Sequence, residues 1–426
     1  MSDHSEVSVL TEPSTTALSP KHAPPWLFGI TSIPYGIVGA FAGTTMPFLA
    51  RKAGINMEDI GWFGFATMIP PMLQFLYAPI IDIGPKRKVW LVLVSILGAL
   101  CLGGAMMMPL PGKVGAFMGL TVAGQLISGL VGSCNGGIIS ASMPDAMRGK
   151  TAGWLNTGNL TGGAIGASVS LWMTTHNVDP RYIGLALFAM MLLPSLAALA
   201  IPEPERERRE ALGVVFTGML KDVWGVVRVR KGWTGVLLCA SPVGTAALLN
   251  YFSALAPDYH APENVVVFVN GAASGLVTAA GALVGGWACD RMNRRAAYLW
   301  SGALTAIVAL IMRTAPFTPQ TYTIGVLTYL FVAGICYAAF SAFIFEVVGD
   351  SVGKAAATQY TLFTAAGNFA IAYVGKLDTH YHKVHGVRGV LMADAVQNIV
   401  GIVLLVALFW LVLDRHPKVV AQPVAT

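Results

Sequence analysis

The chain of 426 residues carries 27 basic and 21 acidic side chains, so charged types make up 11% of it, whereas soluble globular proteins have about 25%. Hydrophobic types reach 55% and the mean hydropathy is +0.65, which leaves too few polar residues to cover a water-soluble domain. The composition excludes most soluble folds and predicts a protein whose solvent is the lipid bilayer. The net charge of +6 does not indicate nucleic-acid binding, because the bases form short clusters between long apolar runs.

The N-terminal segment and the cysteines exclude further classes. Residues 1–25 are rich in Ser, Thr and Pro and lack an apolar core, so we expect a disordered cytoplasmic tail and no cleaved export signal. The five cysteines lie inside or at the ends of apolar runs without a C-x-x-C spacing, which argues against a disulfide framework and a metal site. No motif indicates a cofactor, and we expect none.

About twelve apolar runs follow, each with the roughly 20 residues that a helix needs to cross the hydrocarbon core. We number these runs as spans one to twelve. The first six are expected at 26–50, 60–82, 89–110, 114–141, 152–174 and 182–201, and the second six at 233–255, 264–289, 297–315, 321–347, 358–376 and 390–413.

The distribution of Lys and Arg predicts the orientation of these spans. With the N-terminus placed inside, most bases fall in the cytoplasmic connections and tails, as the positive-inside rule requires. Both termini are then cytoplasmic, and 414–426 forms the C-terminal tail. The longest inner connection, 202–232, begins with charged residues and continues with apolar residues at helical spacing. It predicts an amphipathic helix on the cytoplasmic membrane surface, with a solvated linker as the alternative.

One sequence motif occurs twice, at the cytoplasmic ends of spans two and eight. Ala78 begins the first copy and Gly286 the second, an offset of 208 residues. The repeat predicts two related six-helix bundles, at 26–201 and 233–413, and therefore an all-α integral membrane fold of twelve transmembrane helices. We expect the charged side chains of the motif to form a cytoplasmic gate, in which each Asp pairs with a base or a helix N-terminus of the opposite bundle. The gating residues are Asp82, Lys86, Arg87, Asp290, Arg291, Arg294 and Arg295.

The second copy of this motif carries a family resemblance. Its G-x-x-x-D-R-x-x-R-R run resembles the loop signature of the major facilitator superfamily, with Asn293 where that signature usually has Gly. The runs F-L-Y-A-P-I-I-D (75–82) and A-T-Q-Y-T-L (357–362) resemble the AmpG-type branch, which contains muropeptide permeases and acetyl-coenzyme A transporters. Residues 133–142 lack the acidic side chains that this branch typically has late in its fourth helix. The resemblance implies transport by alternating access, proton-linked symport and a bacterial cytoplasmic membrane.

Eight uncharged polar residues lie near the middle of the predicted spans. A polar side chain that faces lipid is costly, so we expect them to line a solute cavity between the bundles or, as the alternative for any one of them, to hydrogen-bond between helices. No Lys or Arg lies near the centre of a span. This favours a small neutral or weakly charged solute, such as a sugar-containing cell-wall fragment, over a polyanion such as acetyl-coenzyme A. The eight residues are Tyr35, Gln74, Gln125, Asn159, Asn250, Asn270, Tyr337 and Asn368.

Proton coupling would need a buried carboxyl group that changes its protonation between conformations. Only Glu346 and Asp394 qualify by position, and both lie close enough to span ends to reach the interface instead. An uncoupled facilitator and a transporter-fold solute sensor remain alternatives to symport. The spans carry neither a catalytic constellation nor a P-loop, so we expect neither an enzyme nor an ATP-driven pump. We also expect a monomer.

The histidines fall in predicted loops and tails. The outer segment His380–His385 holds their only cluster. Its spacing is irregular, and no Cys or close carboxylate pair completes a metal site there. We therefore expect a solvated loop rather than a metal site.

Overall fold

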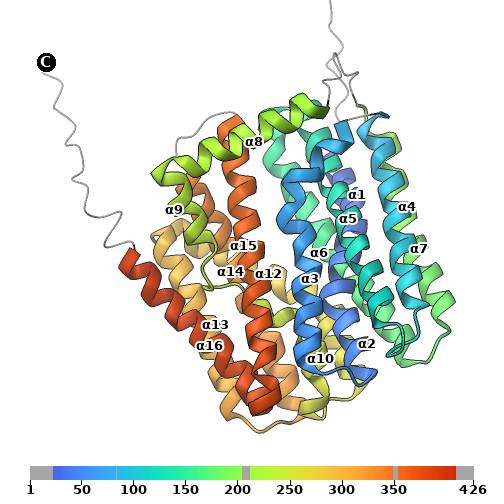
Figure 1. Ribbon diagram of the computed structural model, residues 1–426, viewed down its shortest axis with the longest axis vertical. Helices are drawn as coiled ribbons and strands as arrows, with labels where there is room; N and C mark the ends of the chain where they lie inside the picture. The colour runs from blue at the N-terminus through green and yellow to red at the C-terminus, as the bar shows by residue number, and fades with distance from the viewer. Residues whose placement is uncertain (1–22, 83, 204–211, 349–353, 409–426) are drawn as a thin grey trace, which may run out of the picture.

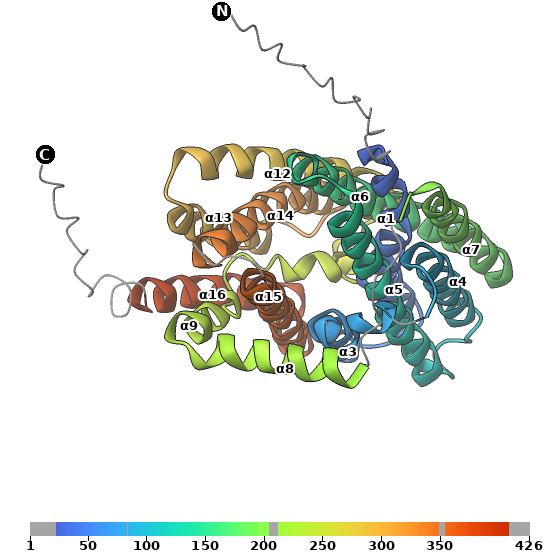
Figure 2. The same cartoon turned by 90° about the horizontal axis from the view of Figure 1, so that it is seen from above.

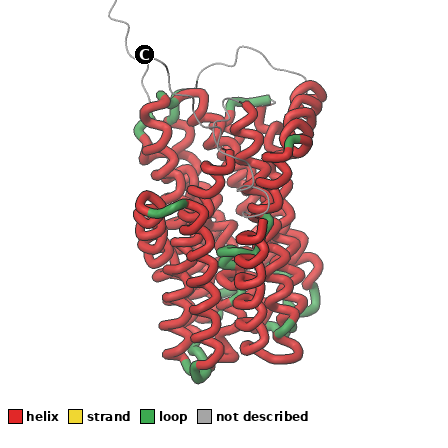
Figure 3. Tube along the Cα trace, turned by 90° about the vertical axis from the view of Figure 1, so that its left-hand side faces the viewer, coloured by secondary structure: helices red, strands yellow, loops and turns green. Residues whose placement is uncertain are grey.

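The computed structural model describes residues 23–82, 84–203, 212–348 and 354–408. All regular secondary structure in these ranges is helical (Figures 1 and 3), which confirms the predicted all-α class. The predicted N-terminal and C-terminal tails lie almost entirely outside the described residues, as does the charge run of the linker.

The first half of the fold begins at Pro25 and ends at Ala200. Asn56 illustrates how its helices begin, because the Asn56 side chain accepts a hydrogen bond of 2.9 Å from the backbone N–H of Asp59, which satisfies an otherwise unpaired helix donor. The elements are α1 (Pro25–Ala40), η1 (Phe41–Thr45), α2 (Met46–Lys52), α3 (Met57–Tyr77), η2 (Ala78–Asp82), α4 (Arg87–Met106), α5 (Val114–Ser142), α6 (Asp145–Thr175), α7 (Pro180–Leu196) and η3 (Ala197–Ala200).

The second half follows the connecting helix α8 (Leu212–Arg228). Asn293, the unusual residue of the second motif copy, caps α13, because its Oδ1 accepts a hydrogen bond of 2.9 Å from the N–H of Arg295. The elements are α9 (Arg230–Cys239), η4 (Ala247–Asn250), α10 (Phe252–Leu255), η5 (Ala256–Tyr259), α11 (Glu263–Val267), η6 (Phe268–Ala272), α12 (Ala273–Arg291), α13 (Arg294–Thr314), α14 (Pro319–Val348), α15 (Lys354–His380) and α16 (His382–Leu408).

Nine helices of the described chain are long and apolar enough to cross a membrane. The three other predicted spans differ for two reasons. Helices α6 and α15 have 31 and 27 residues and are long enough, but they carry too many polar side chains. Span seven is not a continuous helix, since it is divided into α9, η4 and α10.

Several helices extend beyond the apolar runs that predicted them. Helix α6 begins at Asp145 rather than at 152. Helix α16 begins at His382 rather than at 390, although Gly386, with a φ of 56°, separates its first turn from the rest. The reason is that helical hydrogen bonding can continue outside the hydrocarbon layer, where polar residues are tolerated. The expectation of a loop was wrong for most of His380–His385, because His380 ends α15 and His382 begins a helical turn. Tyr381 forms a turn between the two helices, and Gly386 interrupts α16 with a φ of 56° directly after His385.

Small residues allow pairs of helices to pack closely within each half. Helices α1 and α6 lie against each other along their length, and a side chain at Gly158 or Gly162 would meet the backbone of Gly29 or Ile33. In the second half a side chain at Gly281 would meet the backbone of α14 in the same way. Such small-residue contacts are typical of helix pairs in membranes.

The two halves lie side by side, as Figure 2 shows from above. They meet where α3 packs against α15 and where α6 packs against η6 and α12. Helix α8 lies across one end of the bundle, the end at which α1 begins, and α2 and α10 lie at the opposite end (Figure 1). We call these ends the α8 face and the far face.

Helix α8 is the amphipathic helix that the linker sequence predicts. Its exposed apolar side chains are Phe216, Leu220, Trp224 and Val227, at the spacing that places them along one side of a helix. The helix contacts α15 of the second half and η2 of the first half.

Candidate functional site

Span seven is interrupted by a non-helical segment between Cys239 and Ala247. Two residues of this break have a left-handed backbone, Gly244 with a φ of 63° and Ala246 with a φ of 51°. Glycine adopts this conformation freely, whereas for an alanine it costs about 1–2 kcal/mol. The surrounding structure must therefore hold the break in place, which is typical of functional segments.

Side chains from three other helices satisfy the backbone groups of the break. The Tyr373 hydroxyl of α15 donates to the Ala240 carbonyl at 2.9 Å, and the Tyr298 hydroxyl of α13 donates to the Val243 carbonyl at 2.9 Å. The N–H of Gly244 donates to Oδ1 of Asn398 on α16, also at 2.9 Å. Because an unpaired backbone group is costly in a membrane interior, irregular backbone occurs there only when it is paired in this way or lines a cavity.

Two π-helical turns border the same region. Turn η1 interrupts span one and η6 interrupts span eight, and both contact α6. Single π turns inside α-helices occur frequently at functional sites. The Ser253 hydroxyl of α10 donates to the Thr44 carbonyl of η1 at 2.7 Å, and Oδ1 of Asn250 lies so close to Gly43 that a larger residue there would displace the Asn250 side chain. Irregular segments of both halves therefore meet directly.

A cavity of about 260 Å³ lies between the halves at this meeting point. It is lined by α1, η1 and α6 of the first half and by η4, η6, α12 and α14 of the second. A second cavity of about 210 Å³ lies within the second half, against the break and α13 to α15. Tyr337 lines both cavities, and neither is lined by a charged side chain of the described chain.

Five of the eight predicted solute residues lie in the walls of these cavities. Asn159, Asn250 and Asn270 line the first cavity together with Tyr337, and Asn368 lines the second. The first cavity thus brings together amide groups from one helix of the first half and two segments of the second. Such groups donate and accept hydrogen bonds without carrying charge.

The other three predicted residues lie inside the first half and are not among the lining residues of either cavity. Nε2 of Gln74 donates to the Gly129 carbonyl at 2.8 Å and to the Ser133 hydroxyl at 3.1 Å, both on α5. Gln125 is buried in α5, and Tyr35 packs against an apolar cluster of the first half. The hydrogen bonds of Gln74 match the interhelical alternative. A role in solute binding stays a prediction for all three residues.

A larger hollow of about 660 Å³ opens elsewhere, on the far face of the first half. Leu49, Phe117 and Ile183 line it together with residues of the α4–α5 connection. Because all its walls belong to one half, relative movement of the halves would not expose it alternately to the two sides. We therefore place the candidate solute site in the smaller cavity between the halves.

Ionic contacts join the halves at the far face. Arg51 of α2 contacts Asp258 of η5 at 3.3 Å, and Lys52 contacts Glu263 of α11 at 2.7 Å. His382 of α16 adds a contact of 3.2 Å between its Nε2 and Asp258. The contacts of Arg51 and Lys52 tie the two halves together at the far face.

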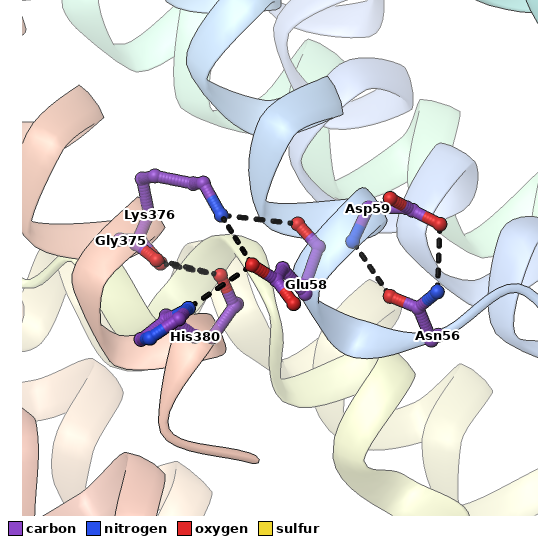
Figure 4. Close-up of polar contacts among 7 residues, drawn as sticks. Asn56, Glu58, Asp59, Gly375, Lys376 and His380 are labelled. Carbon is purple, nitrogen blue, oxygen red and sulfur yellow. Dashed lines mark hydrogen bonds and ion pairs between the residues drawn. The ribbon is translucent and has the colours of Figure 1, made fainter. Parts of the chain in front are cut away.

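Glu58 forms further ionic contacts between the halves (Figure 4). Its Oε1 lies 3.0 Å from Nδ1 of His380 and 3.9 Å from Nζ of Lys376. The Lys376 ammonium also lies over the Trp62 ring, 4.6 Å from its centre. The histidines of this segment thus contact carboxylates across or near the interface, and no group of three His, Cys, Asp or Glu side chains suited to a metal occurs in the described chain.

The predicted gating residues at the α8 face make contacts within their own halves. The Arg87 guanidinium donates to the Gly137 carbonyl of α5 at 3.0 Å, and Arg291 lies over the Trp287 ring at 4.3 Å. Lys86 and Arg294 are exposed, and the backbone of Arg295 is held by the Asn293 cap. The side chains of Asp82 and Asp290 lie outside the described residues, so the gate stays a prediction.

Two aspartates are fully buried in the second half. Asp394 of α16 accepts hydrogen bonds of 3.2 Å on both carboxyl oxygens from the Tyr329 hydroxyl. Asp378 of α15 accepts a hydrogen bond of 2.6 Å on Oδ1 from Nε2 of Gln397, while its Oδ2 has no partner in the described chain. Asp394 is buried within the protein and does not reach the membrane–water interface. The side chain of Glu346 lies outside the described residues.

The apolar run of span eleven did not indicate that Asp378 is a buried carboxylate. It ended span eleven at 376, whereas α15 continues to His380. The expectation that only Glu346 and Asp394 qualify was therefore wrong. Extending the helix to the next strongly polar cluster would have placed Asp378 near Asp394 at the same end of two consecutive helices.

These features define a class of protein. Two six-helix halves that enclose an uncharged polar cavity, with broken helices around it, are the architecture of membrane transporters that expose a central site alternately. A sequence model of the Major Facilitator Superfamily matches residues 28–375. The chain belongs to this family, and is therefore a multi-pass membrane transporter rather than an enzyme. No curated protein sequence matches it.

Solved structures share the fold at low sequence identity. A mutant of the nucleoside transporter NupG has a TM-score of 0.69 at 14% identity, with 90% of this chain and 99% of that chain covered. A D-xylose–proton symporter has a TM-score of 0.68 at 14% identity, with 90% and 96% covered. A bacterial homologue of the human lysosomal transporter Spinster has a TM-score of 0.65 at 12% identity, with 89% and 94% covered. At such identities the likeness concerns the fold alone.

Proposed function

We propose that this chain is a secondary active transporter that moves a small neutral or weakly charged solute across the cytoplasmic membrane as a monomer, by alternating access and with proton coupling. The observation that carries the proposal is the uncharged polar cavity between the halves, lined by Asn159, Asn250, Asn270 and Tyr337. Amide and phenol groups match the hydroxyl groups of a sugar or nucleoside. A polyphosphate would instead need cations in the cavity wall.

The size of the cavity supports the small end of this solute class. Its volume of about 260 Å³ is below the roughly 300–1,000 Å³ of sites for drug-sized ligands. The AmpG-type resemblance supports a sugar-containing cell-wall fragment, and two structural neighbours are described as a nucleoside transporter and a D-xylose–proton symporter. A single sugar unit is common to these solutes.

The closed far face supports an inward-facing state. The positive-inside distribution of bases places the α8 face in the cytoplasm, and the ionic contacts of Arg51 and Glu58 close the other side. The Spinster homologue and the xylose transporter XylE from E. coli are described as inward-facing and as partially occluded inward-open. Solute release would then occur on the α8 side.

Uptake into proteoliposomes tests this function. Radiolabelled D-xylose, uridine, N-acetylglucosamine and acetyl-coenzyme A would be compared with and without an imposed pH gradient. We expect accumulation of a neutral solute that depends on the gradient. Equal rates with and without the gradient would indicate a facilitator. Binding of a solute without its accumulation would indicate a sensor. A preference for acetyl-coenzyme A would refute the neutral-solute assignment.

The cavity residues provide the matching variant. Asn250→Ala removes an amide from the cavity wall, and loss of one or two hydrogen bonds of about 1 kcal/mol each weakens binding roughly 5- to 30-fold. The half-saturation concentration for uptake measures this change. Thr217→Ala, at an exposed site on α8, is the control and should leave it unaltered. An Asn250→Ala protein with an unchanged value would contradict the proposed site.

A further inference from the structure

The carboxyl groups of Asp378 and Asp394 lie in an environment without a compensating cation. The titratable groups that interact with them most directly are the phenols of Tyr251 and Tyr329 and the thiol of Cys336. Phenols and thiols are predominantly neutral at physiological pH. They can donate hydrogen bonds to a carboxylate but cannot neutralise its charge.

None of the described basic residues of the neighbouring helices pairs with these aspartates, including Arg313, whose buried Nε has no hydrogen-bond partner in the described chain. Lys376 and His380, on the same helix as Asp378, contact Glu58 of α3. Arg388 of α16 lies over the Phe317 ring at 5.4 Å. Neither these residues nor Arg313 of α13 forms an ion pair with either aspartate in the described part of the chain.

Two charged carboxylates in this position would be strongly unfavourable. A buried charge without a partner costs several kcal/mol. Asp378 bonds to Gln397, which lies three residues after Asp394 on α16, and the Asp394 charge acts on Asp378, so two charged carboxylates would also repel each other. Binding a proton removes one charge and lets the second group accept the available hydrogen bonds. Such a pair titrates as a unit rather than as two independent groups.

A continuous set of contacts leads from this pair to the solute cavity. The Tyr329 ring packs edge-on against the Phe252 ring, with 5.1 Å between their centres. The Phe252 carbonyl accepts a hydrogen bond of 3.0 Å from the Tyr322 hydroxyl. Nδ2 of Asn270, which lines the cavity, donates to that hydroxyl at 2.6 Å. Phe252 is therefore linked to Asp394 on one side and to the cavity on the other.

We propose that Asp378 and Asp394 together bind one exchangeable proton, and that its binding is transmitted to the solute cavity through Tyr329, Phe252 and Tyr322. This inference rests on the proposed transport function and assigns its coupling site. When the pair loses its proton, the Tyr329 hydroxyl bonds to a charged carboxylate and this bond becomes stronger. The Tyr329 ring then shifts against Phe252 and moves the wall that carries Asn270.

The break in span seven allows such a movement. Phe252 begins α10, a helix of four residues that follows the left-handed Ala246 and is therefore not rigidly continuous with α9. Asn398 fixes the other end of the break to α16, because its Nδ2 donates to the Asp394 carbonyl at 2.9 Å while its Oδ1 accepts from Gly244. A short segment held by a few such contacts can adopt two arrangements, and both the aspartate pair and the solute cavity can shift the equilibrium between them.

Infrared difference spectroscopy of the full chain in liposomes tests the proton site. On raising the pH, we expect the band of a protonated carboxyl group to disappear in the wild type and to be absent in Asp378→Asn or Asp394→Asn. Asp222→Asn, at an exposed position of α8, is the matched control and should keep the band. If an Asn variant does not fold, the Asp→Glu variant at the same position must shift the band. A band unaffected in all these variants would overturn the assignment.

Thiol labelling tests the link to the cavity. Ser274→Cys introduces a cysteine at the cavity wall, in a protein that also carries Cys101→Ser. Its rate of labelling by a maleimide is measured at each pH and divided by the rate for the same protein unfolded at that pH. We expect the labelling rate to change over the same pH range as the carboxyl band. In Tyr329→Phe or Tyr322→Phe the labelling rate should no longer depend on pH, while the carboxyl band persists. Tyr182→Phe, on the exposed side of α7, is the control.

The outcomes separate this inference from the transport function. Labelling that stays pH-dependent in both tyrosine variants would refute the link. Gradient-driven uptake that survives in the Asn variants of both aspartates would refute the coupling site while leaving transport intact. A titrating carboxyl band in a protein that moves none of the four test solutes would leave the proton site supported and contradict the proposed function.

Discussion

Carboxylates occur in two contrasting environments in this transporter. At the far face, Glu58 and Asp258 contact Lys, Arg or His side chains and are partly exposed to water. In the interior, Asp378 and Asp394 are fully buried and have only amide and hydroxyl partners in the described chain. The first arrangement can open cheaply because water replaces each lost partner. In the second arrangement neither water nor a cation stabilises a charged carboxylate, so the pair is suited to holding a proton.

The interior aspartates should give the largest effect in a test of this contrast. Asp394→Asn cannot exchange a proton, so we expect gradient-driven accumulation to fall by about tenfold or more, within the 5- to 150-fold range of typical coupling energies. Exchange of labelled for unlabelled solute across the membrane should persist, because the cavity is intact. Accumulation and counterflow assays on the same proteoliposomes measure the two effects. Equal loss of both activities would show that the substitution damages folding rather than coupling.

The far-face carboxylate Glu58 should give an intermediate effect. Glu58→Gln keeps the shape but removes the charge that faces Lys376 and His380, so opening of the far face becomes easier. We expect the ratio of open to closed states to rise about two- to fivefold. Spin-label distances between Ala53→Cys and Ala261→Cys, in the far-face connections of the two halves, report this ratio. An unchanged distance distribution would show that these contacts do not hold the far face closed.

The most exposed contact should give the smallest effect. The Lys52 and Glu263 side chains are 41% and 45% exposed, so water screens their attraction and replaces it when they separate. Lys52→Gln should therefore change the spin-label distance distribution less than Glu58→Gln. A larger opening of the far face in Lys52→Gln than in Glu58→Gln would show that the more buried ionic contact is not the stronger one.

The sequence predicted the architecture because the governing constraint is local. A helix must supply about 20 apolar residues to cross the bilayer, and this requirement can be counted along the chain. The length of the apolar run did not reveal the break in span seven, although Pro242 and Gly244 within the break are residue types that interrupt helices. An apolar Pro–Gly segment still satisfies a hydropathy criterion, and only its partners Tyr298, Tyr373 and Asn398 show that it is not helical.

The candidate site was predictable only in part. Asn159, Asn250 and Asn270 reach the cavity, whereas Gln74 binds α5, and nothing in their local sequence distinguishes the two outcomes. The direction of a polar side chain depends on which helix lies beside it, and that is set by packing between distant spans. Asp378 was missed for a different reason, since its helix extends beyond the apolar run.

Helix α8 has a mechanical consequence for this architecture. Its 17 residues extend over about 25 Å, and it contacts η2 on one side of the central seam and α15 on the other. A helix that contacts both halves must lose one of these contacts, or move with both halves, when the halves separate at the α8 face. The helix that joins the halves in sequence thus also resists their separation at this face.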